Sequence, residues 1–228
     1  MIKAVVFDLD DTLISERQYV LSGFNVVSKE ISYRYNLDSS IVFMKMQELF
    51  DESSKEVFDR VLEVFNIDYK KEEIIDLINI YRNHKPEIEF YDDVIPTLEE
   101  LKSKGIKVGI ITDGYKETQR RKLDALKCNE LFDEIIITDE LGREFWKPHE
   151  KPYKMMAEKL GVELNEMAYI GDNVAKDFIT ANKIGVTTVC VERKKGIYFG
   201  EKVSEEFLPN HKIRKISEID SHLSYAIL

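Results

Sequence analysis

The stretch Val5–Ile14, "VVFDLDDTLI", places three aspartates directly after a run of apolar residues. The β-branched residues before the first aspartate predict a buried strand. Asp8, Asp10 and Asp11 then follow within four positions. Like charges at this spacing repel one another, and each loses hydration on burial. Either this turn is solvated or a positively charged group lies beside it.

Short runs rich in β-branched residues recur along the chain and alternate with stretches of helical periodicity. The runs comprise residues 2–9, 106–112, 134–138, 167–171 and 186–191. Such alternation is typical of strand-helix units in a parallel sheet. Between residues 15 and 86 the apolar residues instead recur at helical spacing without a strand-like run.

These two sequence patterns predict an α/β fold in which a three-layer, Rossmann-like parallel-sheet core carries an inserted helical domain. We expect residues 1–14 and 88–228 to form the core and residues 15–87 to form an all-helical cap domain. Two unrelated domains in tandem would not explain the pattern, because the first strand cannot fold without the later strands. Residues 193–228 are ambiguous, apart from an apolar-polar alternation around residues 213–219.

Composition narrows the function classes. The chain has 228 residues, 43% of them hydrophobic, and a net charge of −10, which disfavours nucleic acid and anionic membranes as partners. No apolar run approaches membrane-spanning length. Cys128 and Cys190 lack metal-ligand spacing, and no signal segment precedes the first strand, so we expect a cytoplasmic protein. The sequence does not indicate an oligomeric state.

Polar signals follow three further predicted strands or the loops after them. Thr112 and Asp113 end the second strand, Lys147 lies in a loop after the third, and "GDNVAKD" (171–177) follows the fourth. Each signal alone is ordinary, since turns, helix caps and solvated lysines are common. Ligands of such sheets bind beyond the carboxyl ends of the strands. Together the signals therefore predict one site at that edge.

The motifs "DLDDTL", "ITDG", "KP" and "GDNVAKD", in this order, resemble those of the haloacid dehalogenase-like (HAD) superfamily of Mg²⁺-dependent phosphohydrolases. The resemblance covers nearly the whole chain. It equates Asp8 and Asp10 with the family's Asp-x-Asp-x-Thr motif, Thr112 with its second motif and Lys147 with its third. The acidic fourth motif corresponds to residues 171–177.

Two positions depart from the family pattern or leave a choice. Asp113 stands where many relatives carry Asn, which adds a negative charge near the expected phosphate site. Both Lys147 and Lys151 precede a proline. We prefer Lys147, because the family commonly has an aromatic residue about six positions after its lysine, and Tyr153 occupies that place.

The resemblance also implies a role for each residue. Mg²⁺ prefers hard oxygen ligands, which Asp8, Asp172 and the backbone carbonyl of Asp10 would supply, with Asp177 in the outer shell. A bound dication would also make the clustered carboxylates tolerable.

In the chemistry that the family implies, Asp8 attacks phosphorus and Asp10 acts as general acid and then as general base. Thr112, Asp113 and Lys147 are expected at the phosphate group, where Thr112 and Lys147 would bind its non-transferring oxygens.

The function expected from these roles is hydrolysis of a small phosphorylated metabolite, either a sugar phosphate or a nucleoside monophosphate. The dehalogenase branch of the family resembles the phosphatases but lacks the second aspartate, so Asp10 favours phosphoryl transfer. A phosphomutase would use the same residues and stays an alternative. A catalytically silent binding or regulatory protein is a further alternative. Such a protein would be expected to have lost at least one motif residue, whereas all six are present: Asp8, Asp10, Thr112, Lys147, Asp172 and Asp177.

Several other residues have two interpretations each. Tyr19, Phe24 and Phe43 could line the inner face of the cap, but aromatic residues at helical spacing are more often core. The run 120–122, "RRK", is interpreted as the solvated face of a helix. Arg193 to Lys195 could reach a remote anionic group of the substrate. Phe145 and Trp146 could anchor the lysine loop against the core or bury a dimer contact. Alternatively, Trp146 could face the cap and close the active-site crevice when the cap moves.

Overall fold

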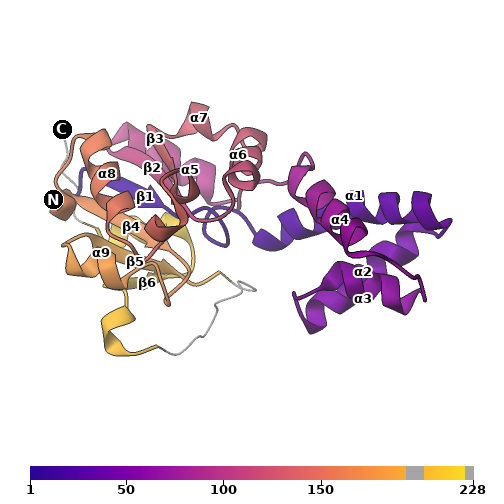
Figure 1. The fold of residues 1–228 in the computed structure, drawn as a ribbon. Helices are drawn as coiled ribbons and strands as arrows, with labels where there is room; N and C mark the ends of the chain where they lie inside the picture. The colour runs from indigo at the N-terminus through magenta and orange to yellow at the C-terminus, as the bar shows by residue number, and fades with distance from the viewer. Residues whose placement is uncertain (194–202, 224–228) are drawn as a thin grey trace. The chain divides into compact units, whose positions relative to one another are not determined.

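A computed structural model describes residues 1–193 and 203–223 of the chain (Figure 1). The strands are β1 (Ala4–Phe7), β2 (Lys107–Thr112), β3 (Glu134–Ile137), β4 (Met167–Gly171), β5 (Thr187–Val191) and β6 (His211–Ile213). The helices are α1 (Glu16–Tyr35), α2 (Ser39–Glu52), α3 (Val57–Val64), α4 (Lys71–Asn83), α5 (Val94–Ser103), α6 (Lys116–Ala125), α7 (Cys128–Leu131), α8 (Lys151–Leu160) and α9 (Ile179–Lys183). Short 3₁₀ helices are η1 (Thr138–Glu140), η2 (Arg143–Phe145), η3 (Leu164–Glu166), η4 (Glu205–Phe207) and η5 (Ile216–Ser221).

The six strands form one parallel sheet in the order β3-β2-β1-β4-β5-β6, which confirms the predicted α/β fold. Strand β1 lies between β2 and β4, and every residue of β1 is buried. From β1 the chain adds β2 and β3 on one side and β4, β5 and β6 on the other. The order therefore reverses between β1 and β4, where open α/β sheets bind their ligands.

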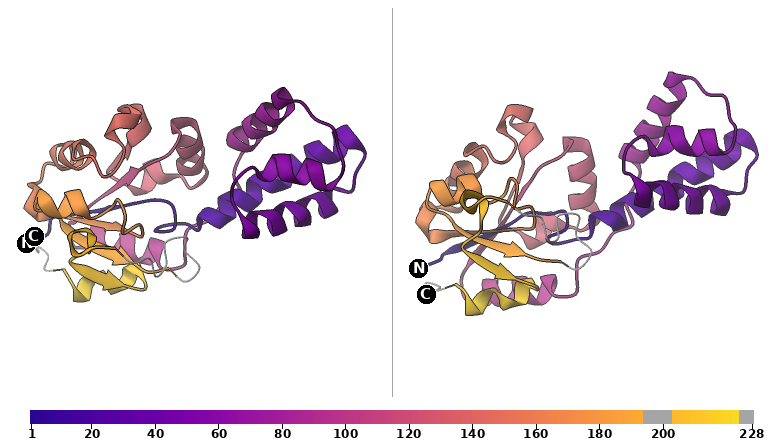
Figure 2. Two further views of the ribbon diagram at one scale, coloured as in Figure 1. Left: turned by 60° about the horizontal axis from the view of Figure 1, so that its bottom comes forward. Right: turned by 90° about the horizontal axis from the view of Figure 1, so that it is seen from below.

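Helices cover both faces of the sheet and complete the three layers (Figure 2). On one face, α8 and α9 pack against alternate side chains of the strands, such as Val6 and Tyr169. Helix α5 lies on the opposite face, where it contacts β2 and η5. Because each central strand is buried on both sides, β1, β2 and β4 consist mostly of apolar residues rather than an alternation.

Strand β6 is the one strand of the described chain that the sequence pattern left unassigned. It comprises His211–Ile213, pairs with β5 and lies at the edge of the sheet. Only Ile213 of its three residues is buried. A strand this short contains too few residues to show a periodicity of its own.

The described chain divides into two compact units, one of residues 1–16 and 89–228 and one of residues 17–88. All of residues 15–86 are described and none of them lies in a strand. The four helices α1 to α4 enclose an apolar cluster to which Phe24 belongs, while Tyr19 is also buried. Asp38 caps α2 by accepting bonds from the backbone N–H groups of Ser40 and Ile41 at 2.8 and 3.3 Å.

Within residues 1–193 and 203–223, none of the helices combines the length and the apolar character that crossing a bilayer requires.

Candidate active site

Three neighbouring strands bring the predicted site residues to one edge of the sheet. Asp8 follows β1 directly, Thr112 is the last residue of β2, and Asp172 follows β4. The order β2-β1-β4 makes these strand ends adjacent. The Asp8 N–H donates to the Ile170 carbonyl at 2.8 Å, so the first aspartate continues the β1–β4 pairing. Parallel strands thus place side chains more than 160 positions apart in the sequence side by side.

The three aspartates of the opening stretch have three different partners. The Asp8 carboxylate accepts a bond of 2.6 Å from Lys147, and Asp10 accepts bonds from Lys122. Asp11 has a φ of 50°, in the left-handed region that aspartate tolerates better than most residues. Its carboxylate accepts the Glu16 N–H at 3.0 Å and so satisfies a free donor at the start of α1. Two cations and a helix end therefore balance the three negative charges.

Lys147 is buried among the groups that its charge requires. Its Nζ lies 2.6 Å from Asp8 Oδ1 and 2.8 Å from Asp177 Oδ1, and it donates to the Tyr169 hydroxyl at 2.8 Å. Burial alone would lower the pKa of Lys147, but Asp177 and Asp8 outweigh it and hold that pKa well above its usual range. Lys151, the alternative lysine, instead places its ammonium over the Phe145 ring, 3.5 Å from the ring centre.

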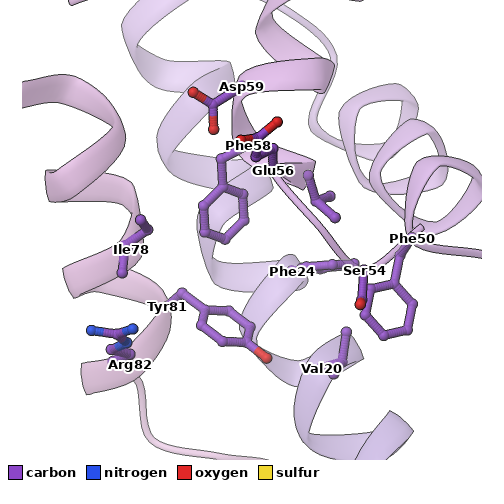
Figure 3. A pocket seen from close by; sticks show the side chains of 11 residues that line it. Val20, Phe24, Phe50, Ser54, Glu56, Phe58, Asp59, Ile78, Tyr81 and Arg82 are labelled. Carbon is purple, nitrogen blue, oxygen red and sulfur yellow. The ribbon is translucent and has the colours of Figure 1, made fainter. Parts of the chain in front are cut away.

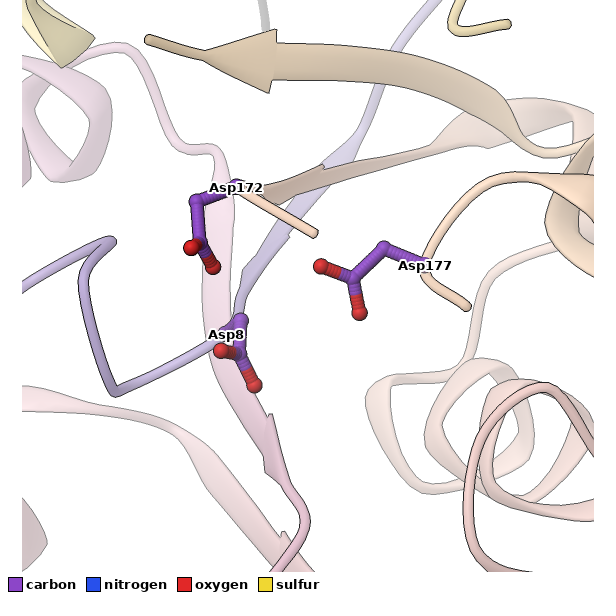
Figure 4. Close-up of side chains that lie close together, drawn as sticks. All are labelled: Asp8, Asp172 and Asp177. Carbon is purple, nitrogen blue, oxygen red and sulfur yellow. The ribbon is translucent and has the colours of Figure 1, made fainter. Parts of the chain in front are cut away.

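Three carboxylates converge beside this lysine (Figure 4). Asp8, Asp172 and Asp177 each offer an oxygen, and these oxygens lie within 4.8 Å of one another. Burial, followed by the charges of Asp177 and Asp8, raises the pKa of Asp172 to about 9. Burial also raises the pKa of Asp8 to about 6, although Lys147 opposes the shift. The cluster thus carries more negative charge than Lys147 alone balances.

The buried oxygens of the cluster fit a hard cation. Within the described chain, Asp172 Oδ2 is buried without a hydrogen-bond partner. Asp177 Oδ1 accepts no hydrogen bond of good geometry either, although its 2.8 Å distance to Lys147 makes an ion pair, which we take as its dominant contact. A divalent cation between these oxygens would give Asp172 Oδ2 a partner and would lower the repulsion among the carboxylates. The Asp10 carboxylate turns to Lys122 instead, so only its backbone carbonyl stays a candidate ligand.

Gly171 permits the close approach of Asp177 to the end of β4. A Cβ atom at position 171 would lie 2.4 Å from Asp177 Oδ2 and 2.8 Å from its Cγ, so the Asp177 side chain would have to shift. The same Oδ2 accepts the Asn173 N–H at 2.9 Å, which holds the turn of "GDNVAKD" around the carboxylate. The glycine before the aspartate in this motif is thus a packing requirement.

Asp113 cross-links the loops at the site. Its Oδ1 accepts the Thr138 hydroxyl at 2.7 Å and the Lys147 N–H at 3.2 Å, and its Oδ2 lies 3.2 Å from Lys176 Nζ. Burial would raise the pKa of Asp113, but Lys147 and Lys176 outweigh it and lower that pKa. The extra negative charge that the sequence places here is therefore compensated by Lys176.

A cavity of about 120 Å³ opens between these loops. It is lined by Asp8, Asp10, Asp11, Glu16, Asp113, Asp172, Asn173 and Lys176. Four of these residues, Asp11, Glu16, Asn173 and Lys176, had no role assigned from the sequence. Burial and the neighbouring Asp10 raise the pKa of Glu16 to about 7. Lys176 is partly exposed, and it adds a cation to the mouth of an otherwise acidic cavity.

Two interpretations of basic residues need correction or refinement. Lys122 was expected on a solvated helix face, but its side chain is only 3% exposed and pairs with Asp10. Arg193 does not project toward the cavity. Its guanidinium donates to the Thr12 carbonyl at 2.9 and 3.1 Å and pairs with Asp93 at 2.9 Å. Lys194 and Lys195 lie outside the described residues.

Trp146 is half-buried, as is Phe145. The indole Nε1 of Trp146 is buried and has no hydrogen-bond partner in the described part of the chain. Phe145 stacks edge-on against His149, with ring centres 5.0 Å apart. These contacts are compatible with an anchor for the lysine loop, and both earlier interpretations stay open.

The helical unit contains a second cavity, of about 240 Å³ (Figure 3). Aromatic rings supply much of its wall, and its polar residues are Ser54, Glu56, Asp59 and Arg82. Tyr81 turns its ring into this space, next to Phe24 and Phe58. The rings of Tyr81 and Phe58 lie 5.7 Å apart in an edge-to-face arrangement. Phe24 therefore lines the interior of the helical unit, in line with the core interpretation of its spacing.

Comparisons with known proteins show the family of the chain. A glyceraldehyde 3-phosphate phosphatase of Methanopyrus kandleri is 33% identical over 202 residues, which cover 86% of each chain. Pyrophosphatase PpaX of Bacillus mycoides is 29% identical and is covered to 95%, with 96% of this chain aligned. The crystal structure of a HAD phosphatase from Thermococcus onnurineus matches the whole chain with a TM-score of 0.65 and 27% identity. Residues 5–191 match the sequence profile of the family described as haloacid dehalogenase-like hydrolase. The chain therefore belongs to the haloacid dehalogenase-like hydrolase family.

Proposed function

We propose that this protein is a phosphatase that hydrolyses a small phosphorylated metabolite through an aspartyl-phosphate on Asp8. The observation that carries the proposal is the buried Lys147–Asp8 pair, 2.6 Å apart at the end of β1, beside Asp172 and Asp177. A nucleophilic carboxylate next to a fixed cation can approach an anionic phosphate monoester, which repels unassisted nucleophiles. The relatives named glyceraldehyde 3-phosphate phosphatase support hydrolysis of a phosphoric monoester.

The residues would divide the reaction into two steps. Asp8 forms a bond to phosphorus while the bond from phosphorus to the leaving oxygen breaks, and the Asp10 carboxyl gives that oxygen a proton. Asp10 then takes a proton from water as the water attacks phosphorus, which releases inorganic phosphate and restores Asp8. Lys147 would keep Asp8 oriented, and the Thr112 hydroxyl at the end of β2 would bind a phosphate oxygen.

The acidic cluster would hold a magnesium ion. Asp8 and Asp172 are the ligands we propose, together with the Asp10 carbonyl, with Asp177 supporting from the outer shell. When bound, the cation neutralises charge on the transferring phosphoryl group. The unpartnered Asp172 Oδ2 supports this assignment, because a buried carboxylate oxygen otherwise lacks the donors that it needs.

Among small phosphorylated compounds we favour sugar phosphates over nucleoside monophosphates. Relatives named glyceraldehyde 3-phosphate phosphatase are 33% and 32% identical to this chain. A relative named as a pyrophosphatase makes inorganic pyrophosphate a further compound to test.

The decisive experiment measures phosphate release from a panel of sugar phosphates, nucleoside monophosphates and pyrophosphate, with Mg²⁺ and with EDTA. We expect Mg²⁺-dependent release by the wild type and none by Asp8→Asn. Asp68→Asn, which changes an exposed aspartate of the helical unit, is the matched control and should retain full activity. Activity in Asp8→Asn would overturn the proposal. Isomerisation without phosphate release would identify a phosphomutase. Absence of activity on every compound of the panel would identify a non-catalytic protein.

A further inference from the structure

Helix α6 presents two buried polar side chains to the active site. Gln119 is 1% exposed and Lys122 is 3% exposed. The two residues are three positions apart, so they lie on the same face of the helix. Burying an ammonium and an amide is unfavourable unless each finds partners. The partners they find are Asp10 and Thr112.

The contacts to Asp10 define the position of its carboxylate. Lys122 Nζ lies 2.7 Å from Oδ1 and 2.8 Å from Oδ2, so the ammonium bridges both oxygens. Gln119 Nε2 donates to Oδ2 at 3.0 Å and also to the Thr112 hydroxyl oxygen at 2.5 Å. The amide thus ties the end of β2 to the loop after β1. Three donor contacts leave the Asp10 carboxylate little rotational freedom.

The Gln119 bond also orients the Thr112 hydroxyl. Because Thr112 Oγ1 accepts from the amide, its own hydrogen stays available for donation to another oxygen. Gly114 makes room for this arrangement, since a Cβ atom at position 114 would lie 3.1 Å from the Gln119 side chain.

We propose that Lys122 and Gln119 are positioning residues that hold the Asp10 carboxyl in place for proton transfer to the leaving group. This inference rests on the proposed phosphatase function. It assigns no direct substrate contact to either residue. Fixing the proton donor removes rotations that would otherwise have to be frozen in the transition state. The gain in the rate of phosphoryl transfer should therefore depend on how much the leaving group needs a proton.

The test compares two phosphate monoesters that differ in this need. Glycerol 3-phosphate releases a basic alkoxide that must be protonated, whereas p-nitrophenyl phosphate releases a phenolate that leaves without a proton. The quantity to measure is kcat/KM, because it reports the steps up to phosphorylation of Asp8 and excludes the later attack of water. Wild type, Lys122→Met, Gln119→Met and the control Arg120→Met are compared in Mg²⁺. Arg120 lies on the same helix and is exposed, with a surface ion pair to Glu140.

We expect Lys122→Met to lower kcat/KM for glycerol 3-phosphate by about 10- to 100-fold, part of the range that general acid catalysis supplies. The loss for p-nitrophenyl phosphate should stay below about threefold. Gln119→Met should show the same selectivity to a smaller extent, and Arg120→Met should change neither substrate. Should Lys122→Met fail to fold, Gln119→Met carries the test, because it leaves the Lys122–Asp10 ion pair in place.

Equal losses on both esters, or no loss on either, would overturn the positioning role. Failure of the proposed function gives a different result, since the wild type would then hydrolyse neither ester. Hydrolysis of both esters by the wild type and of neither by Asp8→Asn confirms that the comparison is made on the proposed site.

Discussion

The substitution Asp172→Asn should stabilise the protein when no metal is present and destabilise it relative to wild type when Mg²⁺ is bound. Asp172 follows β4, faces the carboxylates of Asp8 and Asp177, and has a pKa raised from 3.8 to about 9. At pH 7 the folded protein therefore holds a proton that the unfolded chain releases. This proton uptake lowers the free energy of unfolding by about 1.4 kcal/mol for each pH unit between 3.8 and 7, or by roughly 4 kcal/mol at pH 7.

The measurable gain is smaller than this upper bound. The aspartate is partly exposed, and an amide leaves a donor to be satisfied in the same place. We expect a net stabilisation of about 1–2 kcal/mol, which corresponds to an increase in Tm of about 2–8 °C for a protein of this size. The sign follows from the raised pKa. The destabilisation is absent below pH 3.8 and grows as the pH rises toward 9, so the variant's advantage should grow between pH 5 and pH 8.

The assay is thermal unfolding by circular dichroism in EDTA and in excess Mg²⁺, with Asp68→Asn as control. Ligand at about 100 times its Kd stabilises a folded protein by about 2.7 kcal/mol, and the wild type should gain this while Asp172→Asn gains much less. The ranking of the two proteins should therefore reverse on adding Mg²⁺. A variant that is less stable than wild type in EDTA at every pH, or that gains as much from Mg²⁺, would refute the reasoning.

Three further substitutions test single contacts. Lys147→Met leaves Asp8 and its neighbours without a buried cation, so it should lower the free energy of unfolding by about 3–5 kcal/mol in urea titrations and abolish phosphatase activity; wild-type stability would contradict this. Arg193→Lys keeps the charge but loses the forked contact to the Thr12 carbonyl, and should lower stability by about 1 kcal/mol; an unchanged urea midpoint would count against it. Lys176→Met removes the partly exposed cation of the cavity and should raise KM about tenfold with kcat nearly unchanged, whereas a loss in kcat alone would disprove a binding role.

The sheet was largely predictable from the sequence because its central strands are buried on both faces. Such strands consist of continuous apolar runs that end abruptly in polar residues, as at Phe7–Asp8. The carboxyl-end rule then placed Thr112 and Asp172 beside Asp8. Strand β6 was not predicted because it is an edge strand with one buried residue, and one buried residue produces no recognisable hydrophobic pattern.

The residues that support the site were not predictable in the same way. Helix α6 reads "KETQRRKLDA", in which polar residues occupy nearly every position and no apolar stripe separates a buried face from a solvated one. Lys122 is buried because an acidic partner from a distant loop meets it, and this partnership exists only in the folded chain. Lys176 escaped notice for a related reason, since its relation to Asp113 depends on two loops that the sheet brings together.

The position of β1 in the sheet also bears on how the protein is synthesised. Ala4 pairs with Lys107 on one side and with Met167 on the other, so β1 leaves the ribosome before both of its neighbours and meets β4 only after about 160 further residues. At about 5–20 residues per second, translation of the intervening chain takes on the order of 10 s. Until β2 has been synthesised the apolar segment "AVVF" has no strand to pair with, and until β4 follows one of its two edges stays unpaired. The helices α1 to α4 can meanwhile form from contacts close in sequence. We therefore expect nascent chains that end before β4 to bind chaperones and to lack the catalytic site altogether, because Asp8 acquires its neighbours Asp172 and Asp177 only when that strand docks.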